Sequence, residues 1–330
     1  MSVAVFEQRQ ALDPRLVVDH PSGYLALSER NRRFGLPGVS GFIAYRAQGL
    51  HWIGFGGVHA ATADRGPLLD AFVDQADRRR RSVVFVQVRG EQADLFRSRG
   101  FNVNPFGATY GVRLPGFSLA GTKRMKARQK VKQARAAGLR VREVGVEAPR
   151  DEFTFMRLRA VSDAWLEAKR KKELDFMIGE LGGPENTERR IFVVVDAADE
   201  MQGLITYVPV WGSRPGHLHD LTRRLPGAPV GAMELCNAVA IERFVEEGAP
   251  YLHFGFTPFA VEEEAAAADS GVLSWIVRFL WRHGRAIYPA QSQVAYKLKW
   301  APDYIEPEFL ACRPLSVRAA WDLLLLTRSL

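Results

Sequence analysis

The sequence predicts an α/β fold, with α+β character, in which one structural unit is used twice. Three observations support this prediction. The chain has 330 residues, more than a single domain usually contains. Each half has a series of short apolar strands, an amphipathic helix and a further apolar strand, an order typical of α/β units. No apolar run approaches the about 18 residues that would span a bilayer.

The elements of the first half follow from apolar segments separated by turn residues. Three strands are expected first, then an amphipathic helix and a buried strand, then a short helix closed by Gly100 and two further strands. The expected strands are 24–27, 41–47, 50–55, 83–88, 101–106 and 109–114, and the expected helices are 67–79 and 91–99.

The second half repeats this order after a long helix. Three strands, a helix and a strand follow one another again, and two amphipathic helices come last. The expected strands are 191–196, 203–210, 217–221 and 251–254, and the expected helices are 150–169, 231–247, 273–283 and 317–326. The boundary between the two units is expected near residue 121, where the composition changes.

A strongly basic segment lies at this boundary. Its small and apolar residues recur at helical spacing as far as Gly138, which predicts a short helix with a glycine at its C-terminal cap. The segment contains no acid, and its cations are Lys123, Arg124, Lys126, Arg128, Lys130, Lys132, Arg135, Arg140 and Arg142. A rod of this charge favours a phosphate backbone or an anionic membrane surface as its partner. A solvated helix that merely joins two domains is the alternative.

Composition agrees with a polyanionic partner. The chain has 45 Lys and Arg against 37 Asp and Glu, a net charge of +8, so the nine cations of the basic segment account for the whole excess. Cys236 and Cys312 have no metal-ligand spacing, and we expect buried thiols in a reducing cytoplasm. The expected location is therefore cytoplasmic, with peripheral attachment to the inner face of the membrane as an option.

Several longer motifs occur in a fixed order. The first half contains GFIAYRAQ from Gly41, VVFVQVRGEQADLFRSRGF from Val83 and FSLAGTKRMKARQKVKQARAAGLRV from Phe117. The second half contains SDAWLEAKRKKELDFMIG from Ser162, HDLTRRLPGAPVGAMELC from His219, YLHFGFTPFA from Tyr251 and RHGRAIYPAQSQVAYKLKWAPDYIEPEFLA from Arg282. With these motifs the chain resembles, over about residues 24–310, the cytosolic C-terminal domain of bacterial phosphatidylglycerol lysyltransferases, the multiple peptide resistance factor family.

This resemblance implies a tandem of two GNAT-like acyltransferase folds. Residues 1–120 would form the N-terminal GNAT-like domain, residues 121–142 the basic linking helix, and residues 143–330 the C-terminal catalytic domain. The resemblance also implies transfer of an aminoacyl group, lysyl or similar, from aminoacyl-tRNA to the headgroup of phosphatidylglycerol, with no cofactor and no metal. The tRNA would bind the basic helix through Lys123, Arg124, Lys126, Arg128, Lys130, Lys132 and Arg135.

An aminoacyl-tRNA ester is already activated. The enzyme need mainly hold donor and acceptor together, take up the proton of the acceptor hydroxyl and stabilise the oxyanion. Two departures from the family keep other acceptors open. Gly56, Gly57 and Val58 stand where family members commonly read Gly-Asp-Pro, and we expect no counterpart of the integral-membrane half of the full-length family proteins. The alternatives are a soluble acceptor, an acyl-coenzyme A N-acyltransferase, and a non-catalytic RNA- or membrane-binding module.

The motif His219-Asp220-Leu221-Thr222-Arg223 supplies the first candidate residues. It matches the Asp-Leu-x-Arg motif of the family at a strand end, where an α/β unit exposes its chemistry. By the resemblance, Asp220 would be catalytic and face the amino acid of the donor, and Arg223 would bind the tRNA 3′ end or an acceptor phosphate. His219 is a further candidate for substrate binding. His219 and Asp220 should point to opposite faces of the strand, and we favour Asp220 in the pocket. A structural ion pair or turn cap is the alternative.

The remaining candidates come from the second half. Lys297 and Lys299 match a paired-lysine motif of the family, and in an extended segment they would converge on one point. One would contact the tRNA phosphate or ribose and the other the developing oxyanion, with Lys297 the catalytic member. Glu234 begins the helix after the loop 224–232 and is a third catalytic candidate, as general base or as a carboxylate for a lysyl donor. A favourable charge at a helix N-terminus is its simpler explanation.

An aromatic stripe occurs in the helix expected at 273–283. Trp275, Phe279 and Trp281 lie near Arg278 and Arg282, a composition that suits an interfacial helix on anionic lipid. Ordinary core packing is the alternative, and the same two interpretations hold for residues 321–326.

Overall fold

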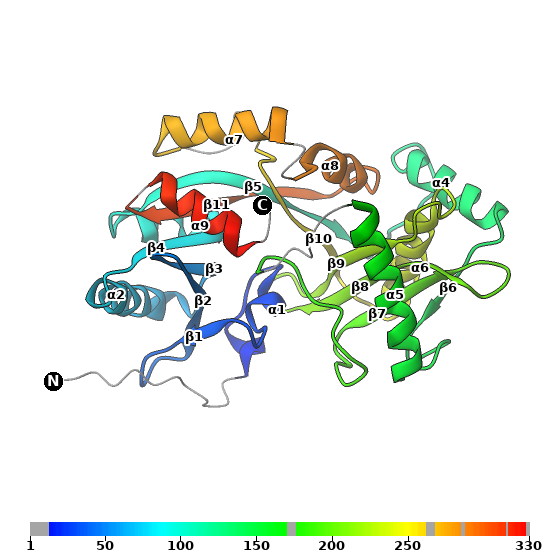
Figure 1. The fold of residues 1–330 in the computed structure, drawn as a ribbon, viewed down its shortest axis with the longest axis horizontal. Helices are drawn as coiled ribbons and strands as arrows, with labels where there is room; N and C mark the ends of the chain where they lie inside the picture. The colour runs from blue at the N-terminus through cyan, green and yellow to red at the C-terminus, as the bar shows by residue number, and fades with distance from the viewer. Residues whose placement is uncertain (1–12, 170–175, 262–267, 285–287, 315, 328–330) are drawn as a thin grey trace.

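The computed structural model describes residues 13–169, 176–261, 268–284, 288–314 and 316–327. These residues form one mixed sheet of eleven strands with helices on both faces (Figure 1). The strand order is β1-β2-β3-β4-β11-β5-β10-β9-β8-β7-β6, so the strands of both halves belong to a continuous sheet. The predicted α/β class is confirmed.

The first half contains an antiparallel hairpin followed by a parallel crossover. Strands β2 and β3 are antiparallel, and β3 pairs with β4 in parallel because α2 carries the chain back across the sheet. The elements are α1 (Gly23–Ala26), β1 (Arg32–Phe34), β2 (Gly41–Gln48), β3 (His51–Ala60), α2 (Thr62–Arg78), β4 (Ser82–Arg89), α3 (Ala93–Arg97) and β5 (Asn102–Arg113).

The second half has the same arrangement. Strands β8 and β9 are antiparallel, and β9 pairs with β10 in parallel through α6. The elements are α4 (Met125–Ala136), β6 (Arg140–Glu143), α5 (Glu152–Lys169), β7 (Arg190–Val195), β8 (Met201–Val210), β9 (Gly216–Arg224), α6 (Ala232–Glu246), β10 (Tyr251–Pro258), α7 (Gly271–His283), α8 (Ala290–Leu298), β11 (Tyr304–Arg313) and α9 (Val317–Leu326). The duplicated unit expected from the sequence is confirmed.

The two units exchange their last strands. Strand β11, from the end of the chain, lies between β4 and β5, and β5 of the first unit pairs with β10 of the second. Glu308 is thus opposite Gly107 on one side and opposite Arg89 on the other. Because β11 completes the sheet of the first unit, the catalytic domain expected at 143–330 shares its sheet with residues 1–120, and the boundaries at 120 and 143 remain predictions.

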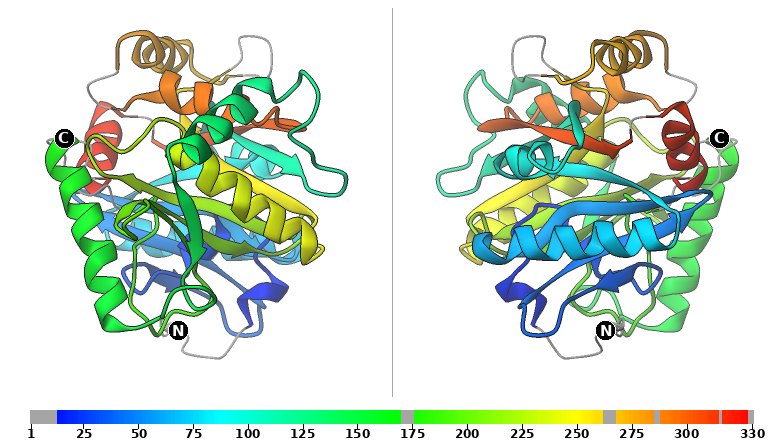
Figure 2. Two further views of the ribbon diagram at one scale, coloured as in Figure 1. Left: turned by 90° about the vertical axis from the view of Figure 1, so that its right-hand side faces the viewer. Right: turned by 90° about the vertical axis from the view of Figure 1, so that its left-hand side faces the viewer.

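Apolar side chains pack the helices onto both faces of the sheet. Figure 2 shows α6 across the second-half strands in one view and α2 across the first-half strands in the opposite view. Phe72 of α2 packs against Phe85 of β4, whereas Phe244 of α6 packs against Phe192 and Tyr207 of β7 and β8. Helix α5 covers the other face of the second unit, so its strands are buried on both sides.

The basic segment forms the predicted helix. Ala127, Val131 and Ala134 of α4 are buried in the core shared with α6, and the cations lie away from this contact. Gly138 has φ = 77°, a left-handed conformation that favours glycine, and its amide closes the helix on the carbonyl of Arg135. The expected C-terminal glycine cap is confirmed.

Some local predictions were wrong. Residues 24–27 lie in and beside the short helix α1, and residues 102–113 form one long strand, β5, in place of the two strands expected, because β10 and β11 supply partners on both of its edges. Lys297 lies in the helix α8, which begins after Pro289, and Lys299 is the residue that caps its C-terminal end, whereas convergence of the two lysines required an extended segment. Strands β1, β6 and β11 were not expected from the sequence.

Candidate active site

A split between β9 and β10 positions the candidate residues. These strands pair only from Tyr251 to His253, opposite Gly216 to Leu218, and separate beyond this point. Gly255, with φ = 67°, sits at a bulge just past the split and packs against Leu218. The free part of β9 carries His219, Asp220 and Arg223. Glu234 lies in the first turn of α6, Lys297 in α8 and Lys299 at its C-terminal cap, and Tyr296 of α8 contacts His219.

Asp220 lies in a buried ion pair. Its Oδ2 binds Nη1 of Arg189, and its Oδ1 accepts a hydrogen bond of 2.9 Å from the amide of Gly179. Both charged side chains are at most 5% exposed. Arg189 also donates to the hydroxyl of Thr206 at 3.1 Å, which aims its guanidinium at Asp220. The carboxylate is therefore held rigidly, and its negative charge is already offset by a partner.

Arg223 lies on the same side of the sheet, against α5. Its guanidinium stacks on the ring of Trp165, with 4.4 Å between the guanidinium carbon and the ring centroid. Its Nε lies 3.4 Å from the hydroxyl oxygen of Ser162. Its Nη1 donates to the carbonyl oxygen of Thr222 at 3.2 Å. Stacking and this hydrogen bond keep the plane of the guanidinium in one orientation. Trp165 and Ser162 belong to a motif that supports the family resemblance, but nothing in their spacing predicts a contact with Arg223.

His219 points to the opposite face, as predicted from strand alternation. Its Nδ1–H donates to Oδ1 of Asn237 at 3.2 Å, and the hydroxyl of Thr222 donates to its Nε2 at 2.7 Å. Burial lowers the pKa of His219 to about 4, so the ring is neutral near pH 7. Both ring nitrogens are engaged, and His219 is suited to hold Thr222 and Asn237 in place.

Lys297 is buried against β10. Its Nζ contacts the carbonyl oxygen of Gly255 at 2.7 Å, that of Phe256 at 3.2 Å and the hydroxyl oxygen of Thr257 at 2.7 Å. Burial lowers the pKa of Lys297 to about 7, and the nearby Glu308 partly opposes this shift. The amine can therefore exchange a proton near neutral pH, unlike an exposed lysine.

Glu234 and Lys299 form a second pair. Nζ of Lys299 donates to Oε1 of Glu234 at 2.7 Å and lies 5.6 Å from the ring centroid of Tyr296, which also contacts His219. This pair joins the first turn of α6 to the end of α8. The two lysines thus have different partners: Lys297 contacts strand β10, and Lys299 binds the carboxylate of Glu234. The prediction that both lysines converge on one point is therefore wrong.

A second buried carboxyl was missed from the sequence. Glu308 of β11 is 1% exposed, and burial raises its pKa to about 8. Its Oε1 lies 3.7 Å from Nε2 of His20, whose N–H is directed at the carbonyl of Gln87 at 2.9 Å. Among the described residues, neither oxygen of Glu308 has a hydrogen-bond donor. Only the strand exchange brings Glu308 beside His20 and Lys297, so no spacing in the sequence could have revealed it.

The basic helix lies next to the start of α6. The carbonyl of Lys130 packs against Gly231, which leaves no room for a side chain there. Some cations of the basic segment already have partners within the protein. Lys123 pairs with Asp303 at 3.7 Å, and Arg135 pairs with Glu242 at 3.8 Å. Arg124 donates a hydrogen bond to the carbonyl oxygen of Trp300.

The other cations of α4 are better placed to meet a ligand. Arg128 donates to the carbonyl oxygens of Leu119 and Gly121. Lys126, Lys130 and Lys132 have no acidic partner within 4.0 Å among the residues that the structure describes. These three lysines therefore form a group whose charge is not neutralised locally.

Metal-binding clusters and bilayer-spanning helices are both absent from the described ranges. Within those ranges, no group of three or more His, Cys, Asp or Glu is arranged to hold a metal ion. In the same ranges, no helix has the length and apolar character needed to cross a bilayer.

Comparisons with known proteins identify relatives. A family model described as "Phosphatidylglycerol lysyltransferase, C-terminal" matches residues 11–312. A protein named lysylphosphatidylglycerol biosynthesis bifunctional protein LysX, from Nocardia farcinica, is 29% identical over 244 residues, which cover 72% of this chain and 21% of the relative. The protein of that name from Mycobacterium leprae is 28% identical over 222 residues, which cover 64% of this chain and 19% of the relative. The chain thus spans about a fifth of the length of these relatives.

Solved structures agree in fold. L-PGS from Bacillus licheniformis superimposes with a TM-score of 0.79 at 20% identity and covers 99% of both chains. The C-terminal domain (DUF2156) of a protein assigned as a lysylphosphatidylglycerol synthetase from Agrobacterium fabrum gives a TM-score of 0.77 at 22% identity, with 95% of this chain and 94% of that chain covered. At these identities the agreement concerns the fold alone.

Proposed function

Because this chain belongs to the phosphatidylglycerol lysyltransferase C-terminal family, we propose that it transfers an aminoacyl group from aminoacyl-tRNA to a hydroxyl of phosphatidylglycerol. The family match over residues 11–312 is the observation that carries this proposal. In the reaction, the acceptor oxygen bonds to the carbonyl carbon of the ester and the bond from that carbon to the ribose oxygen breaks. The proton of the acceptor hydroxyl ends on the ribose oxygen.

The split between β9 and β10 offers groups for these steps. Lys297, with a pKa of about 7, can take up the hydroxyl proton and return it to the ribose oxygen, because its neutral and charged forms are close in energy. Asp220 would hold the ammonium of the donor amino acid beside Arg189. Arg223, oriented by Trp165, would bind a phosphate of the tRNA 3′ end or of the lipid.

Glu234, Lys299 and His219 would support this site. The pair of Glu234 and Lys299 would stabilise the developing oxyanion through the lysine, with the carboxylate as the alternative general base. Neutral His219 would orient Thr222. The lysines of α4 would hold the tRNA backbone at the start of α6.

The start of α6 argues against the acyl-coenzyme A alternative. In an acyltransferase of that kind, a pyrophosphate binds free amides at such a helix start. Here the backbone of α4 packs against Gly231, and the carboxylate of Glu234 lies in the first turn. Both features disfavour a pyrophosphate at this place, whereas the lysines of α4 favour a longer polyanion beside it.

The test is incubation of the protein with charged tRNA and vesicles that contain phosphatidylglycerol. We expect an aminoacylated lipid whose formation stops after ribonuclease treatment, and no product from free amino acid with uncharged tRNA. A ribonuclease-resistant product, or turnover of acetyl-coenzyme A in its place, would refute the proposal. If only a soluble acceptor is aminoacylated, that acceptor and not the lipid is the substrate of the protein.

A further inference from the structure

The outer face of α7 holds large apolar side chains in solvent. Val272, Trp275 and Phe279 are 70%, 61% and 48% exposed, and the rings of Trp275 and Phe279 stack with centroids 5.6 Å apart. Their i, i+3, i+7 spacing places them on one stripe, while Leu273 and Val277 bury the opposite side of the helix. A contiguous exposed stripe of this kind marks an interaction surface.

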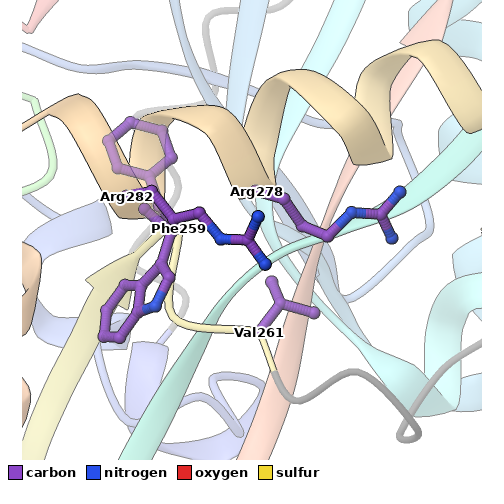
Figure 3. Close-up of a pocket in the computed structure, with 5 residues that line it drawn as sticks. Phe259, Val261, Arg278 and Arg282 are labelled. Carbon is purple, nitrogen blue, oxygen red and sulfur yellow. The ribbon is translucent and has the colours of Figure 1, made fainter.

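A basic hollow adjoins this stripe. It has a volume of about 170 Å³ and is lined by Phe259, Val261, Arg278, Trp281 and Arg282. Arg278 and Arg282 lie one turn apart on α7, and their side chains extend from the same side of the helix near Val261 (Figure 3). Neither arginine has an acidic partner within 4.0 Å in the part of the chain that the structure describes. Guanidinium groups bind phosphate oxygens through paired hydrogen bonds.

We propose that α7 docks on an anionic phospholipid surface, with Trp275 and Phe279 in the interfacial layer and a lipid phosphate held by Arg278 and Arg282 over the hollow. Charge and polarity together select this occupant. The arginines require an anion, and the stripe from Val272 to Phe279 requires an apolar phase beside that anion, a combination that the headgroup region of a bilayer supplies. A nucleic acid would satisfy the arginines but would leave Val272 in water.

This inference deepens the proposed function, since an enzyme that modifies a lipid headgroup must approach the membrane. The docking helix is distinct from the candidate catalytic residues, which come from β9, α6 and α8. Three glutamates, Glu262 to Glu264, follow Val261 outside the described residues.

Vesicle sedimentation with the full chain tests the docking. We expect binding to vesicles of equal parts phosphatidylglycerol and phosphatidylcholine, weaker binding to pure phosphatidylcholine, and loss of affinity at high salt. The double variant Arg278→Gln/Arg282→Gln should bind the anionic vesicles about 25-fold more weakly, since each cation near such a surface contributes about fivefold. The double variant Trp275→Ser/Phe279→Ser should weaken binding to both kinds of vesicle.

Matched controls separate docking from general effects. Arg32 and Arg33 are neighbouring exposed arginines on β1, and Phe153 is an exposed aromatic residue on α5. Arg32→Gln/Arg33→Gln and Phe153→Ser should leave vesicle binding unchanged. The inference is overturned if the α7 variants bind like the wild type, or if the control variants lose as much affinity as the α7 variants.

A soluble acceptor distinguishes failure of the docking from failure of the proposed function. Glycerophosphoglycerol carries the headgroup without acyl chains. An α7 variant that loses vesicle binding but keeps its rate with this acceptor supports docking by α7. A wild-type protein that binds vesicles yet transfers nothing to either acceptor refutes the proposed function and leaves the docking intact.

Discussion

The carbonyl oxygen of Lys130 in α4 packs directly against Gly231, the residue that precedes α6. Gly231 has φ = 88° and no space for a β-carbon on that side. This contact fixes the basic helix against the start of the helix that carries Glu234. A substitution of this one glycine therefore tests whether α4 packs against the start of α6.

Gly231→Ala should destabilise the protein more than Gly227→Ala. Both glycines have a left-handed φ, 88° and 84°, so alanine costs about 1–2 kcal/mol at each. At Gly227 a methyl group would meet nothing within 4 Å, whereas at Gly231 it collides with α4, which adds about 1–3 kcal/mol. Denaturant unfolding of both variants measures the difference. Equal losses of stability would show that α4 does not pack here.

Asp220→Asn should unfold more easily than the wild type. It leaves the buried guanidinium of Arg189 without its countercharge, a change that costs about 3–5 kcal/mol. The stability of this variant must therefore be measured by denaturant unfolding before any rate is interpreted.

The double variant Arg189→Met/Asp220→Asn separates structure from catalysis. It removes both charges, keeps an oxygen for the amide of Gly179, and should recover most of the stability. If Asp220 binds the donor ammonium, transfer remains depressed by about a hundredfold although the protein is stable. Recovery of both stability and rate would show that Asp220 is a structural residue only.

Turnover should depend on the protonation of Lys297. The buried amine has a pKa of about 7, so its neutral form grows between pH 6 and pH 8, and the rate should rise over this interval. Lys297→Met should lower the rate by about a hundredfold and remove this rise. Glu234→Gln should do less and should leave the rise in place. A pH profile that is unchanged in Lys297→Met would exclude the amine as the proton acceptor.

Glu308→Gln should change how stability depends on pH. The pKa of Glu308 is raised from its usual value of 4.5 to about 8, so its protonated form stabilises the fold fully below pH 4.5, and this contribution is lost as the pH rises through 8. The variant keeps a neutral side chain at every pH. Its free energy of unfolding relative to the wild type should therefore increase from pH 5 to pH 8.5. A constant difference between the two proteins would contradict the burial of a titrating carboxyl.

Replacing Lys126, Lys130 and Lys132 by Gln should weaken tRNA binding. Their charges are not neutralised by nearby acids among the described residues, so removing each lysine that binds a phosphate should reduce the log-log salt slope by about one. Turnover at saturating tRNA should change little. Lys123 and Arg135 already pair with Asp303 and Glu242, and their Gln variants serve as comparison variants, with a smaller effect expected for each charge removed. Unchanged tRNA affinity in the triple variant would show that the tRNA binds elsewhere on the protein.

Much of the fold was predictable because its signals are local. The helices α2, α4, α5, α6 and α7 follow from apolar residues at helical spacing, and the cap at Gly138 follows from the glycine itself. The repeat of meander, crossover helix and strand indicated the duplication. Strand β11 escaped prediction because its pairing partners, β4 and β5, lie about two hundred residues earlier in the chain.

The sequence by itself determined the local elements and supplied candidate residues for the chemistry, and the tertiary structure decided the partners of these residues. His219 and Asp220 point to opposite faces because strand residues alternate, which is readable from their order. That Asp220 meets Arg189, that Lys297 meets β10, and that Glu308 is buried beside His20 depends on strands distant in sequence coming together. Burial removes water from these groups, and only this long-range packing sets their charge and pKa.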